Sequence, residues 1–200
     1  MSDTYWIMRR EQVEALTSPI RHEILDRLAA DGPVSVRDLA AMLGRKPTAI
    51  YHHIKRLIAV DLVRSLEPQG GRGRPSLLYG TVAPRMRMAR SAEIPENRPL
   101  IAKGARAMAA IAATDFAAAF EGGQWRGEGE DRNHWFFRVV TSPSPERLSR
   151  INHLLDELAE LVWAVDPEPG PPISIAWFLA PLDVKRPSDP DHHHKQEVLP

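Results

Sequence analysis

The 200-residue chain contains no cysteine, which excludes disulfides, thiolate metal ligands and cysteine nucleophiles together. It also lacks any apolar run near the roughly 18 residues that a membrane-spanning helix needs, and the N-terminus has no hydrophobic segment typical of a signal peptide. Apolar residues make up 43% and charged residues 26% of the chain, so neither disorder nor a fibrous repeat is indicated. We therefore expect a soluble, cytoplasmic protein with one large domain or two small ones.

Local motifs of enzymes and metal sites are missing too. The sequence has no His-Glu-x-x-His, no Gly-x-Ser-x-Gly and no nucleotide-binding glycine loop. Glu157 and Glu160 are three residues apart, but no neighbouring histidine completes a metal-binding pair. The three histidines at 192–194 stand on a polar tail without positioned acidic partners. We predict that the protein is not an enzyme and has neither a cofactor nor a metal site.

The formal net charge is zero, yet the charges are unevenly distributed. Residues 1–90 hold 15 lysines and arginines against 9 acidic residues, whereas residues 91–200 hold 11 against 17. Within 45–90 alone the balance is 10 against 2. A basic segment in a neutral protein is typical of a surface for an anionic polymer, although a solvated basic surface is the alternative.

Three short helices are predicted in the N-terminal third. The first begins at Ser18, which precedes a proline at the first helical position, and ends before Gly32. The second begins at Ser35, with Asp38 in capping-box spacing, and ends at Gly44. The third covers residues 47–59. Tight turns between them predict a compact helical unit.

The third predicted helix has two contrasting faces. Ile50, Ile54 and Leu57 form a narrow apolar stripe at helical spacing. The opposite face is polar, basic and aromatic, which suits insertion into the major groove of DNA. An ordinary surface helix is the alternative.

A basic hairpin follows these helices. Residues 62–66 and 76–82 have the composition of strands, and the loop 67–75 between them is rich in glycine. Arg72 and Arg74 stand in this loop, where they can lie along a phosphate backbone or enter a minor groove.

This order of elements resembles the winged helix-turn-helix domain of ArsR-type transcriptional regulators over residues 8–83. The residues that carry the resemblance are SPIRHEIL at 18–25, LAAMLG at 39–44 and TAIYHHIKRL at 48–57. It implies that helix 47–59 enters the major groove and that the wing, residues 67–75, touches the DNA backbone. Two departures are Lys46, where the family has Ser or Thr, and Asp61, where it has glycine.

The resemblance also assigns candidate contacts. His53 occupies the family's histidine position and is expected to be structural. The residues expected to read bases are Thr48, Ala49, Tyr51 and His52, and those expected to contact phosphates are Lys46, Lys55, Arg56, Arg72 and Arg74.

The C-terminal half is predicted to be a smaller helix-strand-helix-strand domain. A linker, 84–98, leads to an alanine-rich helix at 99–120 that Gly122 and Gly123 interrupt. Residues 134–141 and 173–180 have strand composition, and a helix with an apolar seam begins at Ser144 between them. We assign 99–182 to dimerisation or effector sensing and 183–200 to a disordered tail.

The tryptophans at 125, 135, 163 and 177 would either line an aromatic pocket or pack in a core or interface.

Together these features predict an α+β protein that binds double-stranded DNA in a sequence-specific manner and regulates transcription. The partners expected are DNA, a second copy of the chain, and a small-molecule effector or protein at the C-terminal domain. The alternative is a winged-helix module for protein interaction, or an architectural role, without sequence-specific DNA binding.

Overall fold

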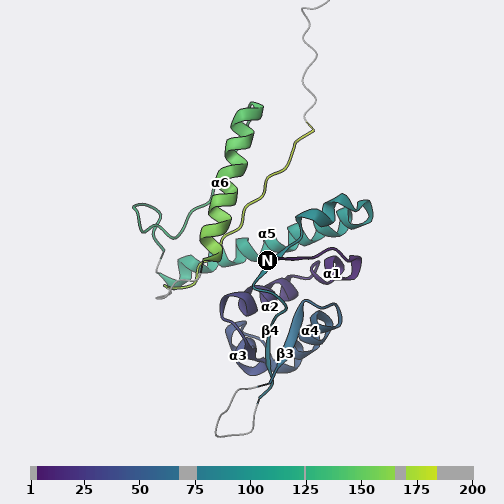
Figure 1. The fold of residues 1–200 in the computed structure, drawn as a ribbon. Coiled ribbons are helices and arrows are strands. Elements are labelled where there is room, and N and C mark those ends of the chain that lie inside the picture. Colours follow the sequence, from purple (N-terminus) through teal and green to yellow (C-terminus); the bar gives the residue numbers. More distant parts are fainter. Residues whose placement is uncertain (1–3, 68–75, 124, 165–169, 184–200) are drawn as a thin grey trace, which may run out of the picture.

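The computed structural model describes residues 4–67, 76–123, 125–164 and 170–183 (Figure 1). Its N-terminal part combines short helices with two small sheets, whereas the described part of the C-terminal half contains long helices and irregular chain. The mixed α and β composition predicted from the sequence is confirmed.

The three predicted N-terminal helices are present as α2 (Pro19–Ala30), α3 (Val36–Met42) and α4 (Pro47–Ala59). The bounds of α4 coincide with those predicted. Ser35 caps α3, because its hydroxyl oxygen accepts a hydrogen bond from the backbone N–H of Asp38 at 3.2 Å. Ser18 precedes α2 in extended conformation but makes no such bond.

A three-stranded antiparallel sheet completes this unit, with the order β2-β4-β3. The strands are β2 (Val34–Ser35), β3 (Val63–Leu66) and β4 (Leu78–Thr81). β3 and β4 form the predicted hairpin, and Leu66 pairs with Leu78 at its described end. Most of the predicted wing, residues 68–75, lies outside the described residues.

The two departures from the family pattern have clear structural outcomes. Lys46 stands at the N-cap of α4 without a side-chain cap bond, as its lack of an acceptor requires. Asp61 has φ of 55°, so it takes the left-handed conformation expected where the family has glycine. Its carboxylate accepts a hydrogen bond from Arg9 at 2.8 Å. The guanidinium of Arg9 also donates to the Val60 carbonyl at 2.8 Å, which ties the end of α4 to the N-terminus.

The N-terminal residues add two elements that sequence patterns did not reveal. β1 (Thr4–Trp6) pairs in parallel with β5 (Arg85–Arg87), and α1 (Arg10–Ala15) follows β1. The buried Gln12 holds this region to α4, since its amide nitrogen donates to Tyr5 Oη at 2.8 Å and to the Val60 carbonyl at 2.9 Å. The pairing of β1 with β5 and the hydrogen bond from Gln12 to Val60 therefore join the N-terminal residues to segments much later in the chain.

The predicted linker, 84–98, contains β5 and two 3₁₀ helices, η1 (Ala89–Glu93) and η2 (Pro95–Asn97). Asn97 is buried, and its amide nitrogen donates to Ser91 Oγ at 2.7 Å and to the Met8 carbonyl at 3.1 Å. The segment is therefore a packed joint between the N-terminal unit and the helix that follows.

One hydrophobic core lies within the N-terminal unit. It is formed by side chains from α1 to β4, and its most completely buried members have no exposed surface. These are Ile24, Leu39, Ile50, Ile54, Leu57 and Leu62.

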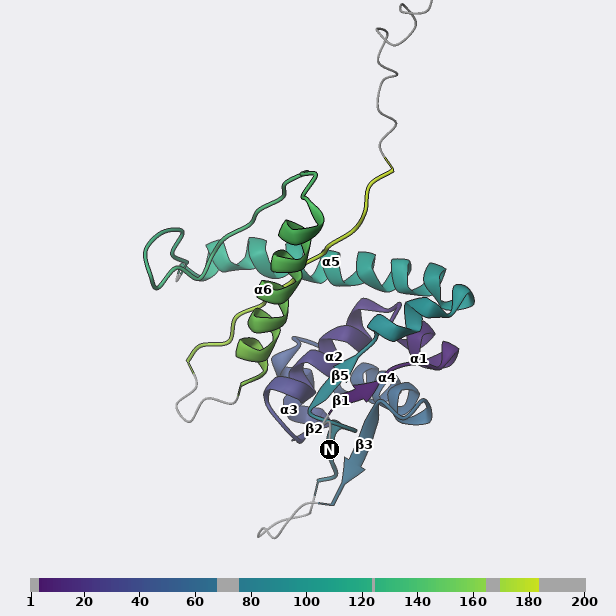
Figure 2. The ribbon, with the colours of Figure 1, turned by 45° about the horizontal axis from the view of Figure 1, so that its top comes forward.

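Two long helices dominate the rest of the described chain: α5 (Arg98–Gly122) and α6 (Pro145–Trp163). The first half of α5 lies across α1 and α2 (Figure 2), where Gly104 and Ala107 are buried. Gly123 ends α5 with φ of 67°, as the glycine pair predicted. Ser144 caps α6 by accepting a hydrogen bond from Arg147 N at 3.3 Å, also as predicted.

The predicted strands at 134–141 and 173–180 are not formed, so the helix-strand-helix-strand prediction is wrong in its strands. Residues 170–183 run as extended chain past α6 (Figures 1 and 2) but pair with no strand. A strand exists only when a neighbour supplies its hydrogen bonds, and the described chain offers none here. None of the described helices is long and apolar enough to cross a membrane.

Candidate nucleic-acid interface

The candidate site is the outer face of α4. This face lies in solvent because the opposite, apolar face of the helix is buried in the core. Ile50, Ile54 and Leu57 are completely buried in the core, which fixes the rotation of the helix. All four predicted base-reading residues are consequently exposed: Thr48, Ala49, Tyr51 and His52. They form one continuous outer surface over the first turns of α4.

Tyr51 and Lys55 interact on this surface. The Lys55 ammonium lies 4.6 Å from the centroid of the Tyr51 ring, in a cation–π contact one helical turn along. Tyr51 remains 44% exposed, so its ring and hydroxyl are accessible to a partner. The contact holds a cation beside an aromatic side chain and reduces the conformational freedom of both.

His52 and His53 have different environments although they are adjacent. His52 is exposed, whereas His53 is half-buried beside it, with their ring centroids 5.9 Å apart. Burial, together with the charges of Arg21, His52 and Arg45, lowers the pKa of His53. Its partial burial agrees with the structural role predicted for it.

Several cations around α4 have no acidic partner among the described residues. Among the described residues, the five arginines that form ion pairs with carboxylates are Arg9, Arg27, Arg85, Arg87 and Arg126. The predicted phosphate contacts Lys46, Lys55 and Arg56 are exposed and form no ion pair with the described chain. Their positive charges remain available to an external anion.

Four further cations, which the sequence patterns did not single out, precede α4 or lie on elements that contact it. Arg45 precedes α4 and Arg64 is exposed on β3. Burial lowers the pKa of Arg21 on α2, and the nearby positive charge of Arg56 lowers it further. Arg21 therefore lies close to Arg56. Arg37 lines a hollow with Tyr51. Only the excess of basic residues within 45–90 signalled two of them, because the other two come from earlier helices.

Arg72 and Arg74, the predicted wing cations, lie outside the described residues. The bases of the wing are described, and β3 and β4 pair over their full lengths. The hairpin therefore starts from a fixed position beside α4, with which β3 is in contact.

A hollow of about 310 Å³ lies between α3, α4 and β4. Its lining includes Arg37, Tyr51 and Tyr79. Burial raises the pKa of the Tyr79 hydroxyl, and the proximity of Tyr51 adds to this. The hollow extends the outer surface of α4 toward the sheet.

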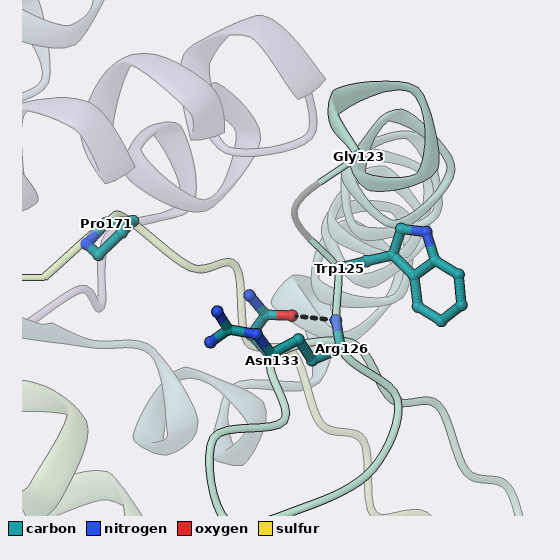
Figure 3. A pocket seen from close by; sticks show the side chains of 5 residues that line it. All are labelled: Gly123, Trp125, Arg126, Asn133 and Pro171. Atoms are coloured by element: carbon teal, nitrogen blue, oxygen red, sulfur yellow. Dashed lines mark hydrogen bonds between the residues drawn. The ribbon is translucent and has the colours of Figure 1, made fainter.

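The C-terminal tryptophans do not converge on one pocket among the described residues. A hollow of about 500 Å³ at the end of α5 is lined by Trp125, Arg126 and Asn133 together with a glycine and a proline (Figure 3). The Arg126 backbone N–H donates to Asn133 Oδ1 there at 2.7 Å. Trp135 and Trp177 are exposed, whereas Trp163 lies under the guanidinium of Arg87 at 4.6 Å.

The comparisons with known proteins match different shares of the chain. Residues 16–83 match a family model described as HVO_A0114. Comparison with curated proteins finds no match. A solved structure described as the crystal structure of RV1404 from Mycobacterium tuberculosis aligns with 17% sequence identity. The alignment covers 75% of this chain and 76% of that one, with a TM-score of 0.28.

Proposed function

We propose that this protein is a sequence-specific, double-stranded DNA-binding transcriptional regulator whose N-terminal unit is a winged helix-turn-helix. The observation that supports this most is the outer face of α4, where exposed polar and aromatic side chains lie among cations without acidic partners. In this proposal α3 and α4 are the helix-turn-helix, and the β3–β4 hairpin is the wing. The protein would act in the cytoplasm, where its DNA target lies.

In the proposed complex, α4 enters the major groove. A groove about 12 Å wide admits a helix, and it exposes a distinct pattern of donors, acceptors and methyl groups for each base pair. Tyr51 and His52 supply hydrogen-bonding groups, while Thr48 and Ala49 supply small apolar contacts suited to a thymine methyl. Because His53 is half-buried beside them, it would support the helix rather than contact bases.

Phosphate contacts would fix the register. Lys46 at the start of α4 and Lys55 and Arg56 near its end are separated along the helix, so they can reach phosphates on both sides of the groove. Arg72 and Arg74 would contact backbone or minor groove from the wing. Two copies related by a two-fold axis would read half-sites about 10 base pairs apart or a multiple of that.

The rival proposal is a winged-helix module that binds a protein or serves an architectural role. The unpaired cations around α4 favour DNA over it, because charged residues are depleted at the centre of protein interfaces. An effector or protein partner would act at the C-terminal half.

Selection of binding sites from a random duplex library, at two salt concentrations, tests the proposal. We expect an enriched motif with two-fold symmetry that persists at the higher salt concentration. His52→Ala should relax the preference at one base position by about 1–3 kcal/mol. Binding that is sensitive to salt but blind to sequence would instead support the architectural role.

Lys55→Ala separates phosphate contacts from base contacts. It should weaken binding to all sequences and reduce the slope of log affinity against log salt by about 0.9 for the lost contact. Lys103→Ala is the matched control, since Lys103 is also exposed but lies on α5. Equal effects of the two substitutions would contradict the proposed role of α4.

A further inference from the structure

Two extended segments after α5, which we call the apolar segments, leave large side chains in solvent. They are residues 134–141 and 173–182, and the second contains no charged residue. Phe136 is 79% exposed and Phe178 is 56% exposed. The large exposed side chains in the two segments are Trp135, Phe136, Phe137, Val139, Val140, Ile173, Ile175, Trp177, Phe178, Leu179 and Leu182.

The area involved is that of a stable interface. At about 100 Å² for each large side chain, the apolar segments expose on the order of 1,000 Å² per chain, against roughly 800 Å² that each partner buries in a standard protein interface. Helix α6 between them adds exposed leucines, of which Leu161 is 73% exposed. Of the described residues after Ala107, Ala159 is the one classed as buried, so this region has no core of its own.

The backbone of the apolar segments points to a strand as the missing partner. Both have strand composition, yet neither belongs to a ladder in the described chain. If the side chains were covered by a helix alone, the unpaired N–H and C=O groups would be buried without hydrogen bonds. An added strand covers side chains and pairs backbone groups at once.

The first apolar segment is held in place at its start. The His134 ring stacks on Phe116 of α5, with the ring centroids 3.8 Å apart, and His134 Nε2 lies 3.0 Å from the Phe116 carbonyl oxygen. Phe136 also contacts Phe116 edge to face. The segment therefore leaves α5 from a fixed point and presents the residues that follow.

We propose that a second copy of this chain covers the apolar segments, and that the segments of the two copies pair to form an intermolecular β-sheet. The second segment has no charge for a charged partner to recognise, whereas a two-fold axis brings the same surface of two copies together. Pairing also satisfies the backbone groups along the strand edges that meet between the copies. The inference does not require DNA binding, because it concerns residues remote from α4 in sequence and function.

The mass of the full chain in solution without DNA is the first test. We expect twice the monomer mass of 22.4 kDa at micromolar concentration. Phe178→Asp should raise the dissociation constant of the dimer by roughly 30-fold or more, as loss of a central interface residue does. Met42→Asp is the matched control, because Met42 is 45% exposed on α3 and should not change the mass. A monomer for the unsubstituted chain, or an open-ended series of larger assemblies, would overturn the proposal.

Cross-linking tests which residues pair and does not depend on a destabilising substitution. The cysteine-free chain allows single cysteines to be placed along 135–140 and 174–179 and the variants to be mixed in pairs. We expect disulfide-linked dimers when both cysteines lie in the apolar segments, with yields that alternate along each segment because neighbouring side chains face opposite sides. Yields no higher than those of Met42→Cys would contradict an intermolecular sheet.

The two proposals fail in different ways. A dimer that selects no DNA sequence would refute the proposed function and leave the intermolecular sheet standing. Conversely, a monomer that binds a single half-site through α4 would refute the sheet and leave the proposed sequence-specific DNA binding standing.

Discussion

Helices α4 and α6 are both amphipathic, but only α4 has its apolar face covered. The stripe of α4 is completely buried by α2, α3 and the sheet, whereas Leu148 and Leu158 of α6 remain exposed. The same difference holds for the regions around them, since the N-terminal unit encloses a core and the region after α5 does not. Amphipathic spacing thus predicts which face of a helix will be covered and says nothing of what covers it.

Truncation of a core residue should give the largest contrast between the two regions. Ile54→Ala should lower the free energy of unfolding by about 2–5 kcal/mol, because it leaves a cavity in a fully enclosed core. Leu161→Ala should change it by less than about 0.5 kcal/mol when measured in the monomeric Phe178→Asp background. Urea denaturation of both variants measures the difference. Similar losses would mean that α6 packs within the single chain.

Asn97→Ala tests the joint between the regions and should have an intermediate effect. It leaves the Met8 carbonyl and the Ser91 hydroxyl without their buried donor, at a cost of about 1–3 kcal/mol. Hydrogen exchange should accelerate in β1 and β5 before it does in α4. Asn152→Ala is the matched control, since Asn152 is exposed on α6 and its loss should cost less than about 0.5 kcal/mol. If the exchange of β5 were unchanged, the joint would not depend on this network.

The contact between α2 and α5 should give the smallest effect, visible as a dependence on pH. Burial, then Asp115 on α5, then Glu23 raise the pKa of Asp26 to about 6. Its ordinary pKa is about 3.9, so its contribution to stability is lost as pH rises from about 4 to about 6. Asp26→Asn should therefore raise the melting temperature at neutral pH and leave it nearly unchanged at about pH 4. The gain is modest, because Asp26 is exposed and solvent screens its charge.

Asp115→Asn should reproduce part of this gain, because it removes the acidic neighbour across the contact. Glu128→Gln, in an exposed loop, is the control and should shift the melting temperature equally at both pH values or not at all. A melting temperature of Asp26→Asn that follows the unsubstituted chain at every pH would contradict the raised pKa.

The local features of the fold could be predicted from the sequence, and those that depend on distant residues could not. The cap at Ser35, the bounds of α4 and the glycine end of α5 follow from neighbours in the chain. The exposed residues of α4 could also be predicted, since a buried stripe fixes the opposite face. In contrast, the parallel pairing of β1 with β5 joins residues about 80 apart and has no local signal.

The strands predicted at 134–141 and 173–180 are a second case in which local composition could not supply information about distant residues. Their composition favours extended chain, and residues 170–183 do run extended (Figure 1), but pairing requires a neighbour that composition cannot identify. The same reason explains the missed cations, because Arg21 and Arg37 reach the surface of α4 only through the packing of α2 and α3.

Gly104 determines how closely α5 packs on the end of α1, and thereby the direction in which α5 continues. A Cβ at this position would stand 3.2 Å from the Leu16 carbonyl oxygen, so glycine allows α5 to rest closely on the end of α1. From there the helix continues to Gly122 over about 27 Å at 1.5 Å per residue, and a tilt of about 5° at the fulcrum displaces its far end by roughly 2 Å. A side chain at position 104 would change the tilt of α5 where it crosses α1. This small change would displace the C-terminal half relative to α4 by a larger distance.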